Sequence, residues 1–415
     1  MIRRAFVSTL CATTMLWTQA LAQTPIGAAR PGSVVSGGAA AQDDRGPSTA
    51  AGQTTLPSGY RPAADSDEAG LWMMGDKAEE NLKTMPTVVR DAALNRYVGG
   101  LMCKLDKATC NDTRLYILDI PYTNAAMSPN GAMQVWTGLL LRTRNEAQLA
   151  CVLGHEMSHY TLRHTLAVWR KAVQMRGATA VLTLVSGGLL GIIAALGSAG
   201  ELMRFSRDEE READAQGQDM VAAAGYDPAQ CAALWEEQLA EQKAEPDQHD
   251  TFVFLRSHPD AAERLATLTA RAAAMPQPAK PWTTGAESFH AATKPFRGTW
   301  LAEELNRTHY GQSLALMQSL LADDPKSGET QYWMAEVYRR RNDSGDASLA
   351  LDAYKNAIAT GAAPAGAYRG LGLIAMKTGD RSGAQDAFQH YLDAAPSADD
   401  RAMVQYYLAH LGDRS

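Results

Sequence analysis

Hydrophobic residues recur at helical spacing in several parts of the chain, and one clear case follows Asn145. Leu149, Val152 and Leu153 form an apolar face there, as the 3.6-residue period of a helix requires. Asn145 is a good N-cap, and Gln148 three residues later completes a start that resembles a capping box. The pattern therefore predicts an amphipathic helix that begins at Asn145.

A strand-like alternation precedes this helix. Two sets of side chains alternate with a period of two, namely Met133, Val135 and Thr137 against Gln134 and Trp136. Asn130-Gly131 just before them is a strong signal for a tight turn. Such a strand could present a free edge to an extended peptide, which would add to it as a further strand. An ordinary internal strand is the alternative.

Positions in the last third of the chain repeat every 34 residues. The aligned sets are Gly311, Gly345 and Gly379, then Leu316, Ala350 and Ala384, then Leu320, Tyr354 and Phe388. This period, with small and large apolar residues at fixed offsets, is typical of tetratricopeptide-type helix pairs. We therefore predict an α-solenoid over residues 299–415, whose concave face could hold a peptide or a partner protein. A generic helical bundle is the alternative.

Composition divides the rest of the chain. Residues 23–65 are rich in Gly, Ala, Ser, Thr and Pro, which predicts a flexible leader. Residues 66–275 are long enough for one domain with a sizeable core. A cluster of prolines follows, which predicts a linker at residues 276–298.

Residues 1–22 have the features of a cleavable signal peptide. Two arginines near the start precede a mostly apolar run, and Ala20-Leu21-Ala22 fits a small-x-small cleavage site. We therefore predict export, most simply to the periplasm. Cys11 suggests a lipid anchor as the alternative, but Leu10 stands where the lipid-attachment motif needs a small residue.

Charge narrows the choice of partners. Loss of residues 1–22 removes two arginines and no acidic residue, so the formal charge changes from −7 to −9. A chain this acidic is not expected to bind nucleic acid.

Four cysteines follow residue 22. Cys103 and Cys110 are close enough in sequence for a local disulfide in an oxidising compartment. Cys151 and Cys231 could pair across the core or stay as buried thiols, and the sequence leaves this open.

The predicted helix after Asn145 contains the motif H-E-x-x-H. His155 and His159 are four residues apart and share one helix face, so both imidazoles can bind one metal ion. Glu156 can reach a water at that ion and take its proton. A surface helix with two ordinary histidines is the alternative.

A third ligand is expected downstream. Glu210 and Asp214 are also four residues apart, so Glu210 can bind the metal while Asp214 accepts a hydrogen bond from a ligand imidazole. Two histidines, one glutamate and water form the catalytic rather than the structural pattern for zinc. Glu209 or Glu212 as the ligand, or a merely solvated acidic stretch, are alternatives that spacing leaves open.

Another class of zinc protease needs glycine and histidine at positions that hold Leu162 and Thr165 here. His164 is one residue out of that register, and we expect it on the helix surface.

These residues resemble a family of zinc metallopeptidases of the gluzincin type. The family includes the CAAX prenyl endopeptidases, the heat-shock membrane proteases and periplasmic quality-control peptidases. Residues 124–140 resemble its segment N-A-x-x-x-P-x-G-x-x-x-V-x-x-G-L-L, and Ser257-His258-Pro259 with Arg264 resembles its S-H-P…R segment. The resemblance covers roughly residues 66–270.

The resemblance implies one zinc ion per chain and polypeptide substrates. It favours the edge position for the predicted strand. It also implies that His258 approaches the zinc, either as a reversible fourth ligand or as a donor to the oxyanion of the transition state. A plain surface histidine is the alternative for His258.

Residues 177–200 are uncharged and apolar, and their length fits a membrane span. A single span would leave His159 and Glu210 on opposite sides of the membrane, so a buried hairpin or a flap with peripheral membrane contact fits better.

Together these patterns predict a mainly α protein, with a metallopeptidase domain that holds a small β-sheet and a repeat domain after it. The expected function is that of an exported zinc endopeptidase in envelope protein quality control, acting on misfolded envelope proteins. A chaperone-like or assembly-factor binding protein with a closed or inactive metal site is the alternative.

Overall fold

The computed structural model describes residues 56–171, 173, 205–246, 258 and 261–411. The predicted signal peptide, most of the predicted leader and the apolar run 177–200 lie outside the described residues. None of the described helices combines the length and the apolar character needed to cross a membrane.

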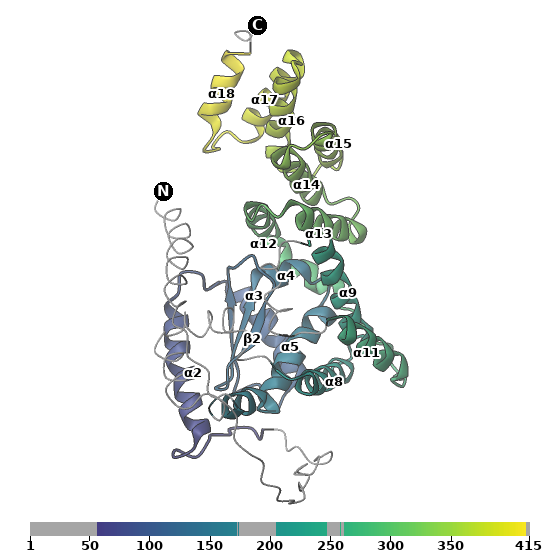
Figure 1. Ribbon diagram of the computed structural model, residues 1–415. Coiled ribbons are helices and arrows are strands. Elements are labelled where there is room, and N and C mark those ends of the chain that lie inside the picture. The colour runs from purple at the N-terminus through teal and green to yellow at the C-terminus, as the bar shows by residue number, and fades with distance from the viewer. Residues whose placement is uncertain (1–55, 172, 174–204, 247–257, 259–260, 412–415) are drawn as a thin grey trace, which may run out of the picture. The chain divides into compact units, whose positions relative to one another are not determined.

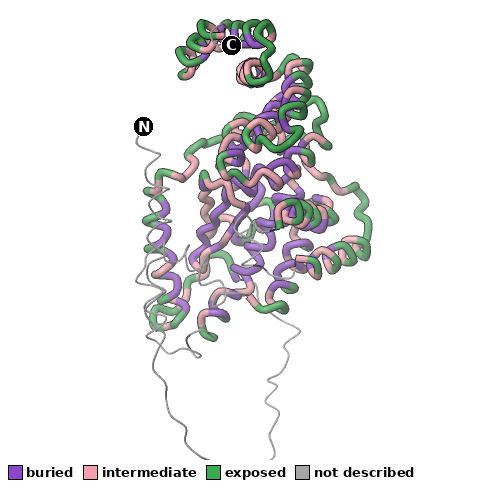
Figure 2. The backbone as a smooth tube through the Cα atoms, turned by 45° about the horizontal axis from the view of Figure 1, so that its top comes forward, coloured by how far each residue is buried: buried purple, intermediate pink, exposed green. Residues whose placement is uncertain are grey.

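Helices dominate the described chain, and the predicted fold class is confirmed (Figure 1). Buried and exposed residues alternate along most of them (Figure 2), as expected of helices that pack one face inward. The helices are α2 (Asp67–Thr84), α3 (Ala92–Leu105), α4 (Thr137–Arg142), α5 (Glu146–Thr161), α8 (Arg207–Ala223), α9 (Ala229–Lys243), α11 (Ala261–Ala274), α12 (Ala286–Asn306), α13 (Tyr310–Asp323), α14 (Gly328–Arg341), α15 (Asp346–Ala359), α16 (Gly366–Thr378), α17 (Arg381–Ala394) and α18 (Arg401–Ala409).

One small sheet precedes α5. Its strands are β1 (Arg114–Leu118), β2 (Ala125–Met127) and β3 (Ala132–Trp136), in the order β1-β3-β2. β1 runs parallel to β3 and β2 runs antiparallel to it. The predicted turn at Asn130-Gly131 joins β2 to β3, and Gly131 has a φ of 89°, which glycine adopts without strain.

The predicted edge position for this strand is wrong. β3 is central, pairs on both sides and has all five residues buried. Alternation showed that the strand has two different faces, but it carries no information on which neighbours pair with it. The two edge strands are β1 and β2, and β2 is the short strand before the turn.

The predicted start of α5 is confirmed. The side-chain oxygen of Asn145 accepts a hydrogen bond from the backbone N–H of Gln148 at 2.9 Å. The Gln148 side chain reaches back to the backbone N–H of Arg144 at 2.8 Å, one residue before the cap. The helix that follows is buried on every side, so α5 forms the centre of the domain.

α5 and α8 cross at two glycines. A Cβ atom on Gly154 would lie 3.1 Å from the backbone oxygen of Gly217, and one on Gly217 would lie 2.8 Å from the backbone nitrogen of His155. Only glycine therefore permits this close approach, which sets the separation between the functional side chains of the two helices.

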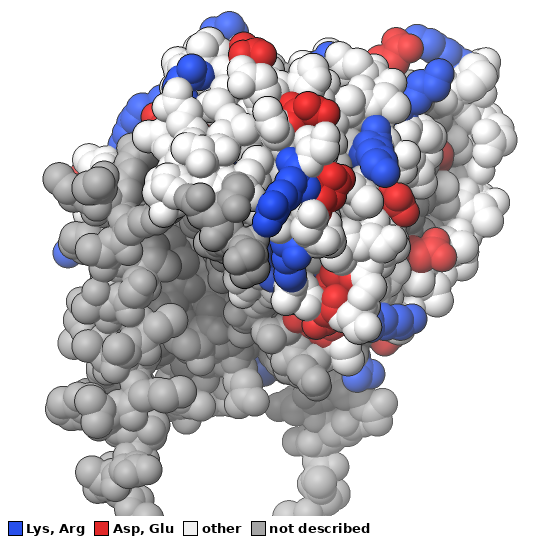
Figure 3. Space-filling model, turned by 90° about the horizontal axis from the view of Figure 1, so that it is seen from above, with Lys and Arg blue, Asp and Glu red and all other residues white. Residues whose placement is uncertain are grey.

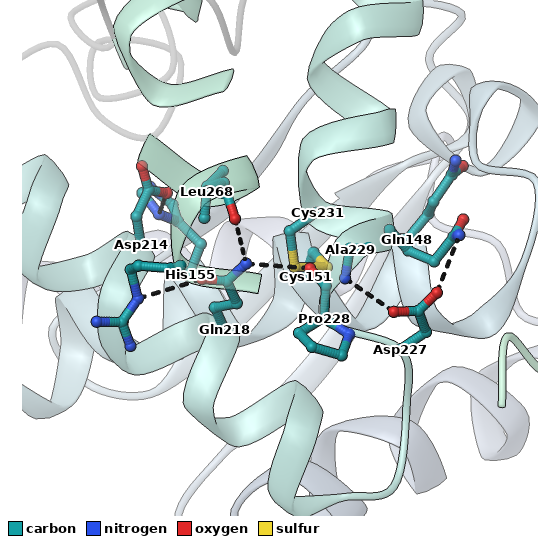
Figure 4. Close-up of a disulfide and its surroundings, with 12 residues drawn as sticks. Gln148, Cys151, His155, Asp214, Gln218, Asp227, Pro228, Ala229, Cys231 and Leu268 are labelled. Carbon is teal, nitrogen blue, oxygen red and sulfur yellow. Dashed lines mark hydrogen bonds and ion pairs between the residues drawn. A yellow bond between two sulfur atoms is a disulfide. The ribbon is translucent and has the colours of Figure 1, made fainter. Parts of the chain in front are cut away.

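Two disulfides cross-link the described chain. Cys103 and Cys110 form the predicted local disulfide. The pairing that the sequence left open is also formed, because Cys151 of α5 is bonded to Cys231 of α9 (Figure 4). The second bond ties the central helix to a helix 80 residues further along the chain.

The helices after residue 310 pack as neighbours in chain order, with extensive contacts between α14 and α15 and between α16 and α17. The aligned apolar positions of the 34-residue period are all buried, namely Leu316, Leu320, Ala350, Tyr354, Ala384 and Phe388. Paired helices of this kind are consistent with a helical repeat domain. The boundary between linker and repeats at residue 298 stays a prediction, and α12 runs across it.

Candidate metal centre

Four side chains from three segments meet in the interior beside the sheet. They are His155 and His159 of α5, Glu210 of α8, and His258, and each offers one ligand atom within 4.8 Å of all the others. All four are buried, with exposed fractions of 2–3%. The helix spacing predicted that the two histidines and the glutamate could share one ion, and the fold brings these three together.

The spacing of the donor atoms fits a metal ion. The Nε2 atoms of His155 and His159 are 3.0 Å apart, and they lie 3.5 and 3.6 Å from the Glu210 carboxylate oxygens. Ligands of a tetrahedral zinc ion with Zn–N bonds of about 2.0–2.1 Å lie about 3.4 Å apart. The donor set of two imidazoles and a carboxylate therefore suits zinc in both type and distance.

Electrostatics favours neutral imidazoles at this position. Burial lowers the pKa of His155 to about 4, and the neighbouring Arg264 adds to this effect. Burial also places the pKa of His159 well below its ordinary value. Neutral rings present lone pairs to a metal ion, so the cluster holds donors ready to bind a cation.

Glu156 lies beside the cluster. It is 3% exposed, and among the described residues its Oε1 atom has no hydrogen-bond partner. Burial raises the pKa of Glu156 to about 7, although His258 and the backbone N–H of Met127 in β2 oppose this rise. A carboxylate with a pKa near neutrality is suited to accept and return a proton.

His258 completes the cluster. Its Nδ1 lies 2.8 Å from Glu210 Oε1 and 3.1 Å from His155 Nε2, and its Nε2 lies 3.4 Å from Glu156 Oε1. The surface alternative for His258 is therefore wrong, and the ring approaches the other donors as the resemblance implied. Burial alone would lower the pKa of His258, but Glu210 and then Glu156 raise it above the ordinary value.

Asp214 contacts His155. The sequence predicted that Asp214 would contact one of the two histidines of the H-E-x-x-H motif, without indicating which. The Oδ1 atom of Asp214 lies 3.0 Å from Nδ1 of His155, and the two side chains lie together near the disulfide in Figure 4. An imidazole that binds a metal through Nε2 needs an acceptor at Nδ1, and Asp214 supplies one for His155.

Arg264 is a part of the site that sequence reasoning did not assign. Its guanidinium binds both oxygens of Asp214, at 2.7 and 2.5 Å, and lies 3.1 Å from Glu210 Oε2. It stacks over the ring of Trp235 at 4.0 Å. Burial alone would raise the pKa of Asp214, but Arg264 and His155 hold it well below its ordinary value. The resemblance of the S-H-P…R segment was the one signal for this residue.

The rival glutamates lie elsewhere. Glu209 caps α8, because its side chain accepts a hydrogen bond from the Ser206 backbone N–H at 2.7 Å. Glu212 points toward His164, with 3.3 Å between Oε2 and Nε2. Glu210 is therefore the glutamate of this stretch that lies in the cluster.

The expectation that His164 lies on the surface is wrong. It is 4% exposed and its Nδ1 lies 2.9 Å from Nδ1 of His159. α5 ends at Thr161, and Arg163 adopts a left-handed φ of 58°. The expectation assumed an uninterrupted helix, whereas this turn carries His164 back onto the metal helix.

Comparisons with known proteins relate part of this chain to metallopeptidases. The model of peptidase family M48 matches residues 89–272. A putative beta-barrel assembly-enhancing protease of Vibrio cholerae is 30% identical over 169 residues, which cover 37% of this chain and 34% of that protein. The mitochondrial metalloendopeptidase OMA1 of Schizosaccharomyces pombe is 32% identical over 153 residues, 36% of this chain and 44% of that protein.

A longer match joins the chain to the beta-barrel assembly-enhancing protease of Escherichia coli. It is 27% identical over 247 residues, which cover 54% of this chain and 49% of the relative. The chain thus spans between about a third and about a half of the length of these three relatives.

Proposed function

We propose that the chain is a zinc-dependent endopeptidase acting on unfolded polypeptides, on the premise that residues 89–272, which the model of peptidase family M48 matches, form a peptidase domain of that family. The observation that carries the proposal is the buried cluster of His155, His159, Glu210 and His258 with Glu156 beside it. The donor set and the spacing of the cluster suit zinc, and the carboxylate of Glu156 lies beside the cluster as a proton acceptor.

In this proposal His155, His159 and Glu210 hold one zinc ion. Bound zinc supplies Lewis-acid polarisation of the scissile carbonyl and makes a water acidic enough to lose a proton near neutral pH. Glu156 takes the proton of the attacking water and gives it to the leaving amine, because its pKa near 7 suits both steps. Asp214 holds His155 in the tautomer that leaves Nε2 free to bind.

The edge strand β2 supports a binding mode for the substrate. Ala125–Met127 pairs with β3 on one side, and the backbone N–H of Met127 lowers the pKa of Glu156. An extended peptide that adds along β2 would pass the general base and the metal ligands. The proposed site at which the substrate peptide pairs with the sheet is therefore β2, and not the strand at residues 133–137 that the sequence predicted.

His258 has a regulatory role in the proposal. Its Nδ1 contacts both Glu210 and His155, so in this proposal it occupies the side of the cluster that water and substrate would use. Position thus favours the reversible blocking role over donation to the oxyanion, and removal of the ring should increase cleavage.

The cellular setting that we propose is the periplasm, with misfolded envelope proteins as substrates. Two disulfides suit an oxidising compartment, and relatives are named as beta-barrel assembly-enhancing proteases. The signal peptide at residues 1–22, peripheral membrane contact through residues 177–200 and a protein partner on tetratricopeptide-type repeats remain parts of this proposal.

Nucleic acid is not a partner in this proposal. The chain has a formal charge of −7. On the face shown in Figure 3, Lys and Arg side chains are interspersed with Asp and Glu rather than gathered into one basic patch. Backbone phosphates would find no concentrated positive surface there.

A second candidate is a binding protein with a closed metal site. One observation favours it: with His258 included, the cluster offers four protein donors, which is the pattern of a structural rather than a catalytic zinc site. In that case the helices after residue 310 would carry the function.

The test measures zinc content and casein cleavage in the purified protein and three variants. We expect about one zinc per chain in the wild type and in Glu156→Gln, and much less in His159→Ala. Cleavage should be lost in Glu156→Gln and His159→Ala and should be faster in His258→Ala.

The outcomes separate the two candidates. Zinc without cleavage in any variant would favour the binding protein. Cleavage by metal-replete Glu156→Gln would refute the assigned general base, and absence of zinc from the wild type would refute the metal site.

A further inference from the structure

His164 is buried against the metal helix but lies outside the donor cluster. The Nε2 atom of His159 faces the cluster, 3.0 Å from His155 Nε2. The Nδ1 atom of the same ring faces the other way, 2.9 Å from Nδ1 of His164. Each ring nitrogen of His159 therefore has a separate neighbour, and His164 occupies the side away from the proposed metal.

A strained backbone residue produces this contact. On a continuous helix, residues five apart point about 140° away from each other, so position 164 could not face His159. The chain instead leaves α5 after Thr161 and passes through Arg163 with a φ of 58°. A left-handed conformation in a residue other than glycine costs of order 1 kcal/mol. The fold retains this strained conformation at the point where the backbone turns the imidazole of His164 toward His159.

A third group extends the contact. The Nε2 atom of His164 lies 3.3 Å from Oε2 of Glu212 on α8. Glu212 is about half exposed, at 51% of its side chain, whereas His164 is 5% exposed. The chain of contacts therefore runs from the buried cluster through His164 to a carboxylate at the surface.

We propose that His164 and Glu212 are a positioning pair, which holds His159 in the tautomer and orientation needed to bind a metal ion through Nε2. An imidazole that binds through Nε2 carries its proton on Nδ1. That N–H points at Nδ1 of His164, which accepts the hydrogen bond while the proton stays on His159. His164 then carries its own proton on Nε2 and donates it to Glu212.

The pair completes the orientation of the two cluster histidines on α5. Asp214 takes the same part for His155, with 3.0 Å between Oδ1 and Nδ1. Phe205 also contacts His159, stacked at 3.9 Å between ring centroids. Stacking fixes the plane of the ring but does not select which nitrogen carries the proton, so it cannot replace His164.

The inference rests on the metal site of the proposed function, and its main readout is metal affinity rather than cleavage. Zinc affinity is measured by competition with a chromophoric chelator in the wild type, His164→Leu and His164→Asn. Leucine fills the space without an acceptor, so affinity should fall about 10–100-fold. Asparagine places its side-chain oxygen near the position of Nδ1, and it should restore most of the affinity.

Two further readouts separate positioning from packing. The visible spectrum of cobalt-loaded protein should change in His164→Leu and resemble the wild type in His164→Asn, because it reports the ligand field at the metal. In casein cleavage, kcat should fall in His164→Leu while KM changes little, since the substrate does not contact His164.

A matched pair of charge variants tests the surface end of the contact. Glu212→Gln should weaken zinc binding by less than His164→Leu does, since an amide oxygen still accepts the hydrogen bond without the charge. Asp208→Asn makes the same charge change on the same helix, where Asp208 pairs with Arg211 and is 86% exposed, and it should leave affinity unchanged.

Several results would overturn the inference. Wild-type zinc affinity in His164→Leu would show that His164 does not act on His159. Equal losses in His164→Leu and His164→Asn would show that packing, not hydrogen bonding, is what the residue supplies. If His164→Leu does not fold, the zinc affinities of His164→Asn and Glu212→Gln still test the inference. We expect nearly wild-type affinity in the first and reduced affinity in the second. A wild type that binds zinc but cleaves nothing would refute the proposed protease and leave this test intact.

Discussion

At the residue scale, the carboxylate of Glu79 joins three parts of the fold. It accepts hydrogen bonds from Arg114 and Tyr116 of β1, at 2.8 and 2.6 Å, and from the Asn130 side chain at 2.9 Å. Burial alone would raise the pKa of Glu79, but Arg114 and Tyr116 bring it down to about 2. This single residue of α2 therefore holds β1 and the turn before β3 in place.

The depressed pKa makes stability depend on acid in a defined window. Because Glu79 has a lower pKa in the folded chain than its ordinary value of 4.5, its contribution is complete above about pH 4.5. It is lost as pH falls toward 2. Urea unfolding across this range should show a loss of stability in the wild type that is smaller in Glu79→Gln.

Glu80→Gln is the control for this prediction, because Glu80 neighbours Glu79 on α2 and is exposed. Its acid dependence should match that of the wild type. Equal acid dependence in all three proteins would contradict the role given to Glu79.

Sequence could identify some site residues and not others, for a physical reason. His155, Glu156 and His159 lie on one helix, so their spacing fixes their relation without knowledge of the fold. Arg264 binds Asp214 from 50 residues away, and His164 depends on one backbone angle at Arg163. Contacts of these two kinds are set by tertiary packing and local strain, which spacing does not report.

At the element scale, the crossing of α5 and α8 sets the width of the metal site. α5 supplies His155 and His159, α8 supplies Glu210, and the helices touch at Gly154 and Gly217. Helical periodicity predicted α5 and its ligands. It could not predict this crossing, because a glycine within a helix shows no local sign of the backbone it will meet.

Gly217→Ala should push the two helices apart. Its Cβ would lie 2.8 Å from the backbone nitrogen of His155, and a backbone atom cannot move aside as a flexible side chain can. We expect a loss of about 1–3 kcal/mol in unfolding free energy, with a lower zinc content. Urea unfolding and metal analysis measure both.

Gly100→Ala provides the contrast. Gly100 lies inside α3 with open space around the added Cβ, so alanine there should stabilise the protein by about 0.5–1 kcal/mol. A Gly217→Ala protein as stable and as metal-rich as the wild type would show that the helices are free to separate.

At the scale of the whole molecule, buried ion pairs join helices on either side of the predicted linker. Arg142 of α4 binds Glu241 of α9 at 2.5 Å and Glu304 of α12 at 2.9 Å, and all three are buried. Composition predicted a linker at residues 276–298 because prolines gather there, but it could not reveal that α12 contributes a charge to the interior of the preceding helices.

The two disulfides should differ in what they contribute to the stability of the molecule. The loop closed by Cys151 and Cys231 spans 80 residues, and the loop closed by Cys103 and Cys110 spans 7. By loss of chain entropy in the unfolded state, the long loop is worth about 4.5 kcal/mol and the short loop about 2.4 kcal/mol.

Unfolding free energies of the two double cysteine-to-alanine variants check this ordering. Removal of Cys151–Cys231 should cost more, and it should also lower zinc content because Cys151 lies one turn before His155. An equal or smaller cost for this pair would contradict the expectation from loop length.

The same two bonds carry a consequence for biogenesis. The four cysteines after residue 22 pair in the order in which they occur, the first with the second and the third with the fourth. When a chain crosses a membrane amino end first, Cys103 is the only one of these four thiols already across as Cys110 emerges. When Cys231 emerges later, Cys151 is the only one still unpaired. An oxidase that joins thiols as they emerge would thus make the native bonds directly. In the proposed periplasmic setting, maturation of this protein should therefore depend on a thiol oxidase but not on a disulfide isomerase.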